Sequence, residues 1–323
     1  MDSITRRGAL ALGIGGAALA SSAGAQAPWP TQPVRLIVPY AAGGPSDIIA
    51  RSLQTPLQGV LGQSVVIENR AGGGAIIGSE AAARSTDGHT FLVADSPHTI
   101  IPAVQARVPY DPVGDFKPVS LVGAVSMILM VNAGLPSRSL AAFIADAKAR
   151  PEAVTFGSSG VGSLTDLLPK WLGLLADARF TTVPYRGSGP ALLDVVAGQI
   201  NAIFSSTLAA SGPLRDGQVR PLGVASTARL AAFPDVPTLR QQGVDLVSSN
   251  WWGVLAAKAN STAAVDRMNA ALNVALADPG VVERFTALGI EARPRGAAPF
   301  AELLATEFTN WARVAQAAGV RVQ

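Results

Sequence analysis

The chain has 323 residues, 49% of them apolar, and a formal net charge of +3. This length suggests two domains, and the apolar share is enough for buried cores, which excludes an intrinsically disordered chain. The small charge, with no Lys/Arg cluster beyond the N-terminus, argues against nucleic acid as a partner, and the absence of cysteine excludes disulfides, thiolate chemistry and a lipid-carrying cysteine.

Residues 1–25 have the features of an export signal. A charged start with Arg6 and Arg7 precedes a Gly/Ala-rich apolar stretch and small residues. The adjacent arginines favour the twin-arginine route, with an ordinary Sec signal as the alternative. Cleavage after Ala25 is preferred, because cleavage after Ala27 would place a proline directly behind the cut. The sequence predicts an exported protein with a cleaved signal and no lipid anchor.

Beyond the signal, compact apolar runs alternate with segments that carry apolar residues at helical spacing. The predicted strands are 34–38, 64–68, 90–94, 125–132, 153–156, 180–185, 201–206 and 251–257. The predicted helices are 45–61, an Ala-rich segment within 69–85, about 140–149, a segment after Gly162, 190–197, 262–277, 280–288 and 298–318. This alternation predicts an α/β fold with helices on both faces of the sheets, which binds ligands at the carboxyl ends of its strands.

Three Gly/Ser/Pro-rich turns, at residues 41–47, 157–163 and 186–190, follow predicted strands and open predicted helices. Glycine lets a ligand approach the backbone, and proline suits the first helical position. First-turn N–H groups have no intrahelical partner and the helix dipole adds positive charge, so such turns bind phosphate or carboxylate. The alternative is that they are simply economical turns, but three similar turns favour anion sites.

The first and third turns are nearly copies of each other. "VPYAAGGPSD" begins at Val38, and "VPYRGSGPAL" begins at Val183. We interpret them as two turns, after Tyr40 and Tyr185, that belong to different lobes and face one cleft.

The sequence offers little that could carry catalysis or hold a metal. His89 and His98 are the only histidines, without companions at ligand spacing. His89 is expected to be a half-exposed turn residue. Both Ser96 and His98 follow a strand at its cleft end and are predicted near the ligand, although His98 could equally be a core residue.

The weak glycine motif of residues 72–78 lacks the Tyr-x-x-x-Lys of reductases, and no Gly-x-Ser-x-Gly elbow is present. We therefore predict no cofactor and no enzyme, with an α/β hydrolase or reductase as the remote alternative. Trp251 and Trp252 are expected in core or hinge packing, or alternatively in the cleft wall.

From about Pro30 to the C-terminus the chain resembles the substrate-binding proteins of tripartite tricarboxylate transporters, the Bug receptors. The matching segments include "PVRLIVPYAAGGPSDIIAR", "VVIENRAGGGAIIGSEAAARSTDGHTFL", "TFGSSGVGS" and "VPYRGSGPALLDVVAGQI". The resemblance implies a two-lobed periplasmic binding protein, type II-like, with a ligand cleft between two α/β domains. Crossover strands near 125–130 and 248–253 would join lobe 1, residues 26–125 plus 252–323, to lobe 2, residues 126–251.

The resemblance also implies a function. A periplasmic receptor would capture a small carboxylate-bearing molecule and deliver it to membrane permease subunits, acting as a monomer; a sensor subunit with the same cleft is the alternative. The residues expected at the ligand are Tyr40, Gly43, Gly44, Pro45, Ser46, Asp47, Ser96, His98, Ser158, Ser159, Gly160, Val161, Gly162, Ser163, Asp166 and Tyr185.

One of these positions departs from the family pattern. Asp166 stands where the family often carries histidine. A carboxylate there is expected to repel a ligand carboxylate or to pair with a ligand cation or hydroxyl, which favours an amino or hydroxy acid over a plain dicarboxylate.

Overall fold

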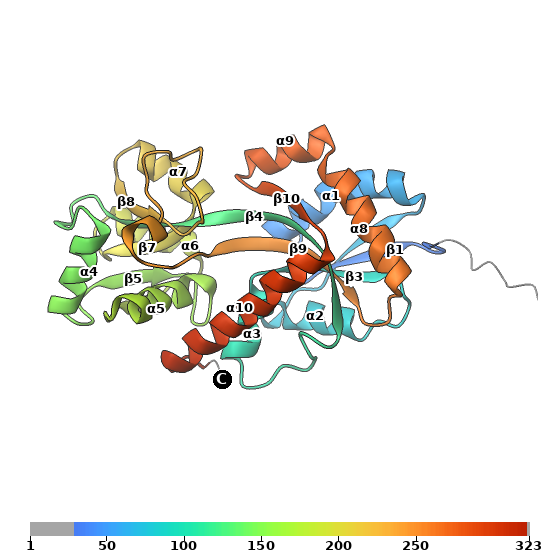
Figure 1. Ribbon diagram of the computed structural model, residues 1–323, viewed down its shortest axis with the longest axis horizontal. Coiled ribbons are helices and arrows are strands. Elements are labelled where there is room, and N and C mark those ends of the chain that lie inside the picture. Colours follow the sequence, from blue (N-terminus) through green and yellow to red (C-terminus); the bar gives the residue numbers. More distant parts are fainter. Residues whose placement is uncertain (1–28, 322–323) are drawn as a thin grey trace, which may run out of the picture.

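The computed structural model describes residues 29–321, so the predicted export signal lies outside the described residues. Two groups of strands and helices lie side by side along the long axis, joined by two long strands, β4 (Phe116–Asn132) and β9 (Ser249–Ala257) (Figure 1). We call the group around the N-terminal strands lobe 1 and the other group lobe 2. Within residues 29–321, no helix is both long and apolar enough to cross a membrane.

Lobe 1 contains a parallel three-stranded core that continues into antiparallel strands. Its strands are β1 (Val34–Val38), β2 (Val65–Asn69), β3 (Thr90–Asp95) and β10 (Glu291–Arg295), with β9 and part of β4. One face carries α1 (Pro45–Leu61), α8 (Thr262–Leu276) and α9 (Pro279–Ala287); the other carries α2 (Ile76–Ala83) and α10 (Ala297–Ala317). All six side chains of β3 are buried, as expected for a strand covered on both faces.

Lobe 2 repeats this arrangement around its own sheet. Its strands are β5 (Thr155–Ser158), β6 (Thr181–Pro184), β7 (Ala202–Ser206) and β8 (Val219–Val224), with the far end of β4. Its helices are α4 (Leu140–Ala149), α5 (Leu164–Ala176), α6 (Ser188–Val196) and α7 (Thr207–Arg215). Separate apolar clusters pack against the two sheet faces, which confirms the predicted α/β layering.

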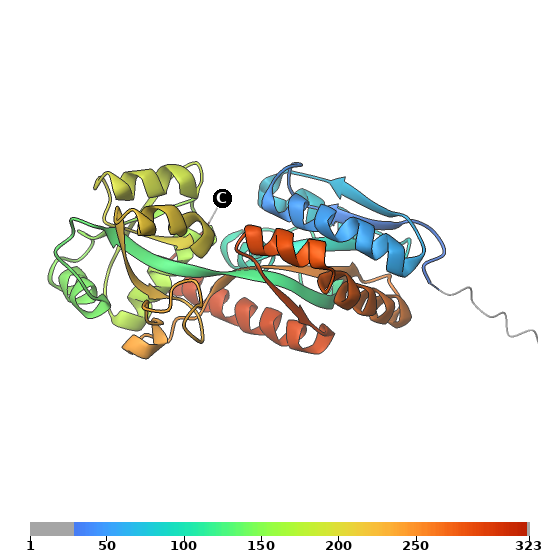
Figure 2. The same ribbon diagram turned by 90° about the horizontal axis from the view of Figure 1, so that it is seen from above.

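The predicted crossover strands are present, and β4 is longer than predicted. Residues 116–126 of β4 pair with β9, and residues 127–132 pair with β7 and β8, so one strand belongs to both sheets (Figure 2). The prediction missed its first nine residues because Pro118 and Gly123 interrupt the apolar pattern. Both stand at register shifts, and a Cβ on Gly123 would lie 2.6 Å from Ile290 Cγ2.

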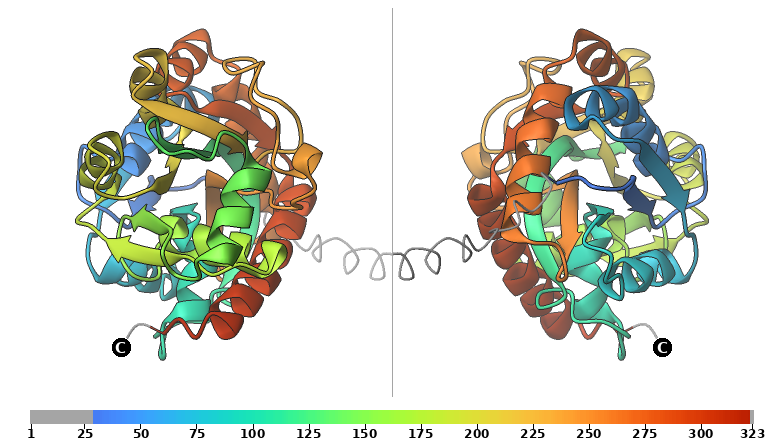
Figure 3. Two further views of the ribbon diagram at one scale, coloured as in Figure 1. Left: turned by 90° about the vertical axis from the view of Figure 1, so that its left-hand side faces the viewer. Right: turned by 90° about the vertical axis from the view of Figure 1, so that its right-hand side faces the viewer.

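A third connection between the lobes was not predicted. Helix α10 starts on lobe 1, where Phe300 packs against Trp251, and runs along one side of the molecule onto lobe 2 (Figures 1 and 3). At its far end the Trp311 ring lies 5.3 Å from that of Trp171 on α5. The end of α10 therefore packs with the core of lobe 2, although the sequence placed all of residues 252–323 in lobe 1.

Candidate functional site

A cleft of about 790 Å³ opens between the lobes, within the range of about 300–1,000 Å³ typical of small-molecule sites. Lobe 1 contributes residues 40–42 and 44–46 and one side of α3 (Pro97–Val104); lobe 2 contributes residues 159–165, the end of β7 and the start of α7. The walls are largely apolar on the α3 side, where Ile100, Ile101 and Met127 lie. The cleft can therefore enclose an organic molecule with a polar end.

Five helix N-termini reach this cleft. Its lining includes residues of the first turn or cap of α1, α3, α5, α6 and α7, represented by Ser46, Pro97, Thr165, Ser188 and Ser206. Among the described residues that line it there is no lysine, arginine or histidine. An anion bound here would therefore be stabilised by backbone N–H groups, helix dipoles and hydroxyls instead of a side-chain cation.

The turn before α1 is held by a carboxylate that points into it. Gly43, at φ +84°, donates its N–H to Asp47 Oδ2 at 2.8 Å, and Arg51 Nε donates to the same oxygen at 2.9 Å. Asn69 Nδ2 donates to Asp47 Oδ1 at 2.9 Å. Burial favours the neutral acid, but these donors outweigh it and hold the pKa of Asp47 below its usual value.

The turn before α5 is built in the same way. Gly162, at φ +75°, donates its N–H to Asp166 Oδ2 at 2.9 Å, and Lys170 pairs with Asp166 from one helical turn further on. Lys170 Nζ also reaches Thr182 on the neighbouring strand. Both turns thus share the pattern Gly-x-x-x-Asp-x-x-x-Arg/Lys, at residues 43–51 and 162–170, and they present their first-turn N–H groups from opposite lobes.

This geometry corrects the expected role of Asp166. Its side chain is buried, satisfied by Gly162 and Lys170, and absent from the cleft lining. Asp47 is likewise turned away from the cleft. Neither carboxylate lines the cleft, so the structure argues against the expected effect of Asp166 on ligand charge; both shape the turns that offer N–H groups.

The third turn is not the counterpart of the first. Of residues 185–190 only Ser188 lines the cleft, and the Tyr185 hydroxyl donates to Asp194 Oδ2 at 2.6 Å on α6. The near-copy of the Tyr40 turn was therefore misleading: the structural partner of that turn is the Gly162 turn. Tyr40 does line the cleft, and its hydroxyl donates to Asp95 Oδ1 at 2.8 Å.

Other predicted ligand residues divide into two groups. The first lines the cleft: Gly44, Pro45, Ser46, Ser159, Gly160, Val161, Gly162 and Ser163. The second lies outside the lining: Gly43, Asp47, Ser96, His98, Ser158, Asp166 and Tyr185. Direct ligand contact for the first group stays a prediction, and the structure argues against it for the second.

The side chains of Ser96 and His98 have structural partners in the protein interior. Ser96 Oγ accepts the backbone N–H of Trp251 at 3.0 Å, which ties the end of β3 to β9. His98 is buried against Phe116 and Phe308, and its Nε2 lies 3.1 Å from the Pro112 carbonyl. Burial lowers the pKa of His98 to about 4, so the ring is neutral at physiological pH.

The two adjacent tryptophans realise both interpretations of the sequence. Trp251 is fully buried in lobe 1, with its indole N–H donating to Glu307 at 2.7 Å. Trp252 lines the cleft, with its indole N–H donating to Ser46 Oγ at 3.0 Å. Strand β9 therefore links the core of lobe 1 to the first anion-binding turn.

Sequence reasoning missed several residues that line the cleft, notably Asp95, Ser205 and Asn250. Ser205 is 1% exposed, and its hydroxyl has no hydrogen-bond partner. Asp95 is 8% exposed, and burial raises its pKa to about 7 despite hydrogen bonds from Tyr40 and Ser46. Asp95 is the last residue of β3 and Ser205 the last but one of β7, near the carboxyl ends of strands, where this fold class places ligand-binding side chains.

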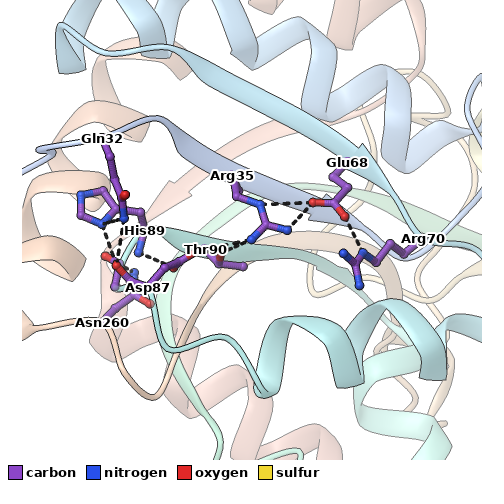
Figure 4. Close-up of polar contacts among 9 residues, drawn as sticks. Gln32, Arg35, Glu68, Arg70, Asp87, His89, Thr90 and Asn260 are labelled. Atoms are coloured by element: carbon purple, nitrogen blue, oxygen red, sulfur yellow. Dashed lines mark hydrogen bonds and ion pairs between the residues drawn. The ribbon is translucent and has the colours of Figure 1, made fainter.

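The remaining histidine belongs to a polar network on lobe 1 (Figure 4). His89 is buried, not half-exposed as expected: Thr31 N–H donates to its Nε2 at 3.1 Å, and its Nδ1 lies 2.9 Å from the Asp87 carbonyl. Nearby, Arg35 connects Glu68 with Asp87. The network joins the first strands of lobe 1, and within the described residues no group of acidic or histidine side chains could hold a metal ion.

Comparison with known proteins agrees with this architecture. A family model described as "Tripartite tricarboxylate transporter family receptor" matches residues 49–320. Protein BugT of Bordetella pertussis is 37% identical over 301 residues, which cover 91% of this chain and 92% of that protein. A TctC solute-binding protein from Polaromonas, at 22% identity and a TM-score of 0.82, covers 89% of this chain with 99% of its own and shows the same fold.

Two similar solved structures contain a carboxylate. MatC from Rhodopseudomonas palustris, with bound malate, is 31% identical with a TM-score of 0.71 and covers 88% of this chain and 99% of its own. Rpa4515 from R. palustris, with adipate, is 30% identical with a TM-score of 0.74, and covers 91% and 99%. This chain belongs to the tripartite tricarboxylate transporter receptor family, the family of the Bug solute-binding proteins.

Proposed function

We propose that the protein captures a small carboxylate-bearing molecule between its lobes, without chemical turnover, and delivers it to the membrane subunits of a tripartite transporter. The observation that carries this is the pair of matched turns at Gly43 and Gly162. In each turn the glycine N–H donates to the carboxylate of an aspartate four residues further on. Each helix N-terminus favours a negative group, and two of them from opposite lobes provide two attachment points for one ligand. The malate and adipate complexes of similar proteins support the same class of ligand.

The fold suggests how capture proceeds. The lobes are joined by β4, β9 and the end of α10, so closure of the cleft bends these connections instead of breaking either core. A ligand that contacts both turns gains contacts only in the closed form and shifts the population toward it. The periplasm is the proposed location and the monomer the proposed state. A sensor subunit that binds the same ligand is the second candidate, and a pull-down of membrane partners separates the two.

The test is thermal unfolding of residues 26–323 against mono- and dicarboxylates, citrate, amino acids and uncharged amides. A ligand specific for the folded state adds about 2.7 kcal/mol of stability at 100 times its Kd. We expect a concentration-dependent rise in Tm for at least one carboxylate and none for its amide. If no acid raised the Tm of protein freed of co-purified ligand, the proposal would be contradicted.

A pair of variants that differ only in charge makes this test more specific. Ala42 is exposed and lines the cleft beside the first turn, so Ala42→Glu places a carboxylate there without disturbing the core. We expect it to weaken carboxylate binding about tenfold or more, because like charges repel in the partly desolvated cleft. The neutral variant Ala42→Gln matches its size and should bind nearly as well as the original protein. Equal losses in both variants would mean that bulk, not charge, is responsible.

A further inference from the structure

The first anion-binding turn has a carboxyl group as its neighbour. Asp95 ends β3 and is the only acidic residue among the described residues that line the cleft. Its carboxyl group receives the Tyr40 hydroxyl at 2.8 Å and a hydrogen bond from the Ser46 side chain. Ser46 is also the second residue of α1, so Asp95 lies beside the N–H groups proposed to hold the ligand carboxylate.

The donors around Asp95 have fixed directions. Because the Trp252 indole can only donate, Ser46 Oγ accepts its N–H at 3.0 Å, and the Ser46 hydroxyl proton is then directed to Asp95. A carboxylate offers about four acceptor positions, of which the Tyr40 and Ser46 hydroxyls and the backbone N–H of Asp95 use three. The group therefore keeps one acceptor position, and it belongs to a residue that lines the cleft.

A ligand carboxylate on the α1 turn and an ionised Asp95 would repel each other. A hydrogen-bond donor on the ligand, close to its carboxylate, removes this conflict by bridging the two groups. We propose that Asp95 accepts a hydrogen bond from a hydroxyl or ammonium group next to the ligand carboxylate, so that this receptor prefers hydroxy or amino acids to the unsubstituted acid. This inference rests on the proposed function, because it presumes a carboxylate on the first turn.

No other described group in the cleft competes for this role. The pKa of Tyr40 is raised by burial and by Asp95, so it remains a neutral donor. Behind the cleft, His98 is buried and neutral, and Glu307 on α10 is held by Thr99 and Trp251 at 2.7 Å each. Asp47 faces its own turn, and the lobe 2 lining contributes no titratable side chain.

The experiment is calorimetric titration with succinate, malate and aspartate, and with propionate, lactate and alanine, at pH 6.5 and 8.5. We expect the hydroxy or amino form to bind at least tenfold more tightly than the unsubstituted acid of the same length. The affinity for the unsubstituted acid should fall as the pH rises, because Asp95 must take up a proton when this acid binds. Titrations in buffers of different ionisation enthalpy measure that proton uptake. Binding of the hydroxy and amino acids should neither weaken as the pH rises nor involve proton uptake. Comparison of malate with aspartate shows whether a hydroxyl or an ammonium group is recognised.

The variant Asp95→Asn should collapse the preference to less than threefold and abolish proton uptake. Glu307→Gln alters the other buried acid nearby and should leave the ranking of ligands unchanged. Unsubstituted acids that bind as tightly as both substituted forms, or a preference that survives in Asp95→Asn, would overturn the inference while leaving carboxylate capture intact. If no acid of either series or of the wider panel binds, the proposed function fails and the inference fails with it.

Discussion

The variant Asp95→Asn is expected to gain about 3 kcal/mol of stability relative to the original protein as the pH rises from 4 to 7. Burial raises the pKa of Asp95 from 3.8 to about 7, so between these values the folded chain keeps a proton that the unfolded chain has released. Stability therefore falls as the pH rises through this window, by about 1.4 kcal/mol for each pH unit. Asparagine cannot ionise, so the variant does not undergo this loss.

His98 supplies an opposite dependence and an internal control. Its pKa is lowered by burial from 6.5 to about 4, so the unfolded chain binds a proton in this window and the folded chain does not. The variant His98→Gln should gain about 3 kcal/mol of stability relative to the original protein as the pH falls from 6.5 to 4.

Urea unfolding at four pH values between 4 and 7.5 measures the stability change of both variants. Burial also raises the pKa of Glu307, which acts in the same direction as Asp95 and remains in both variants. Parallel profiles for the original protein and Asp95→Asn would show that Asp95 is ionised throughout.

Replacing Trp311 by alanine should lower the free energy of unfolding by about 3–5 kcal/mol, the usual cost of deleting a large aromatic side chain from a core. The ring is 1% exposed and packs edge-on against Trp171. It also fixes the end of α10 to lobe 2, so its loss should free one of the three connections between the lobes.

Chemical denaturation measures the loss, and Arg313→Ala is the matched control. Arg313 is an exposed position two residues further along the same helix, where truncation is expected to change stability by less than about 0.5 kcal/mol. If the two variants lost the same stability, the packing of α10 on lobe 2 would contribute nothing.

Much of the fold was predictable because its regular elements follow simple patterns. The predicted bounds of β1, α1 and α4 agree with the structure, since apolar residues recur at strand or helix spacing and Gly44 or Ser139 precedes the helix. Helices α3 and α7 were missed because they have only eight and nine residues, so an internal proline, Pro102 or Pro213, leaves too little helical pattern on either side, whereas the 17-residue α1 is recognisable despite Pro56. Strand β10 is short and is defined by its pairing with β4, which a local pattern cannot reveal.

The candidate site was predictable where the chain itself forms it. The Gly/Ser-rich segments before α1 and α5 predicted two turns that face the ligand, and the structure places both turns at the cleft. The repeated spacing of Gly43 to Asp47 and Gly162 to Asp166 was visible in the sequence and would have identified the true pair of turns. The similar letters around Tyr40 and Tyr185 drew attention to the wrong pair.

The selective part of the cleft could not be predicted, because it depends on contacts between distant segments. The surroundings of Asp95 in the cleft come from Tyr40, in the turn after β1, and Ser46, in the first turn of α1. The isolated sequence around Asp95 reads as the end of a buried strand. Likewise, Ser205 stands opposite Ile128 where β7 pairs with β4, and its unpaired hydroxyl lines the cleft.

The central claim is that one ligand is held by the N–H groups of both matched turns. The most direct test is a crystal structure of residues 26–323 with the acid that gives the largest rise in Tm. We predict ligand oxygens within about 3.2 Å of backbone nitrogens, directly or through one water, in the turns before both α1 and α5, with Asp47 and Asp166 still pointing into their own turns. A ligand that contacted only one lobe, or that was held by side-chain cations outside the cleft, would contradict the claim.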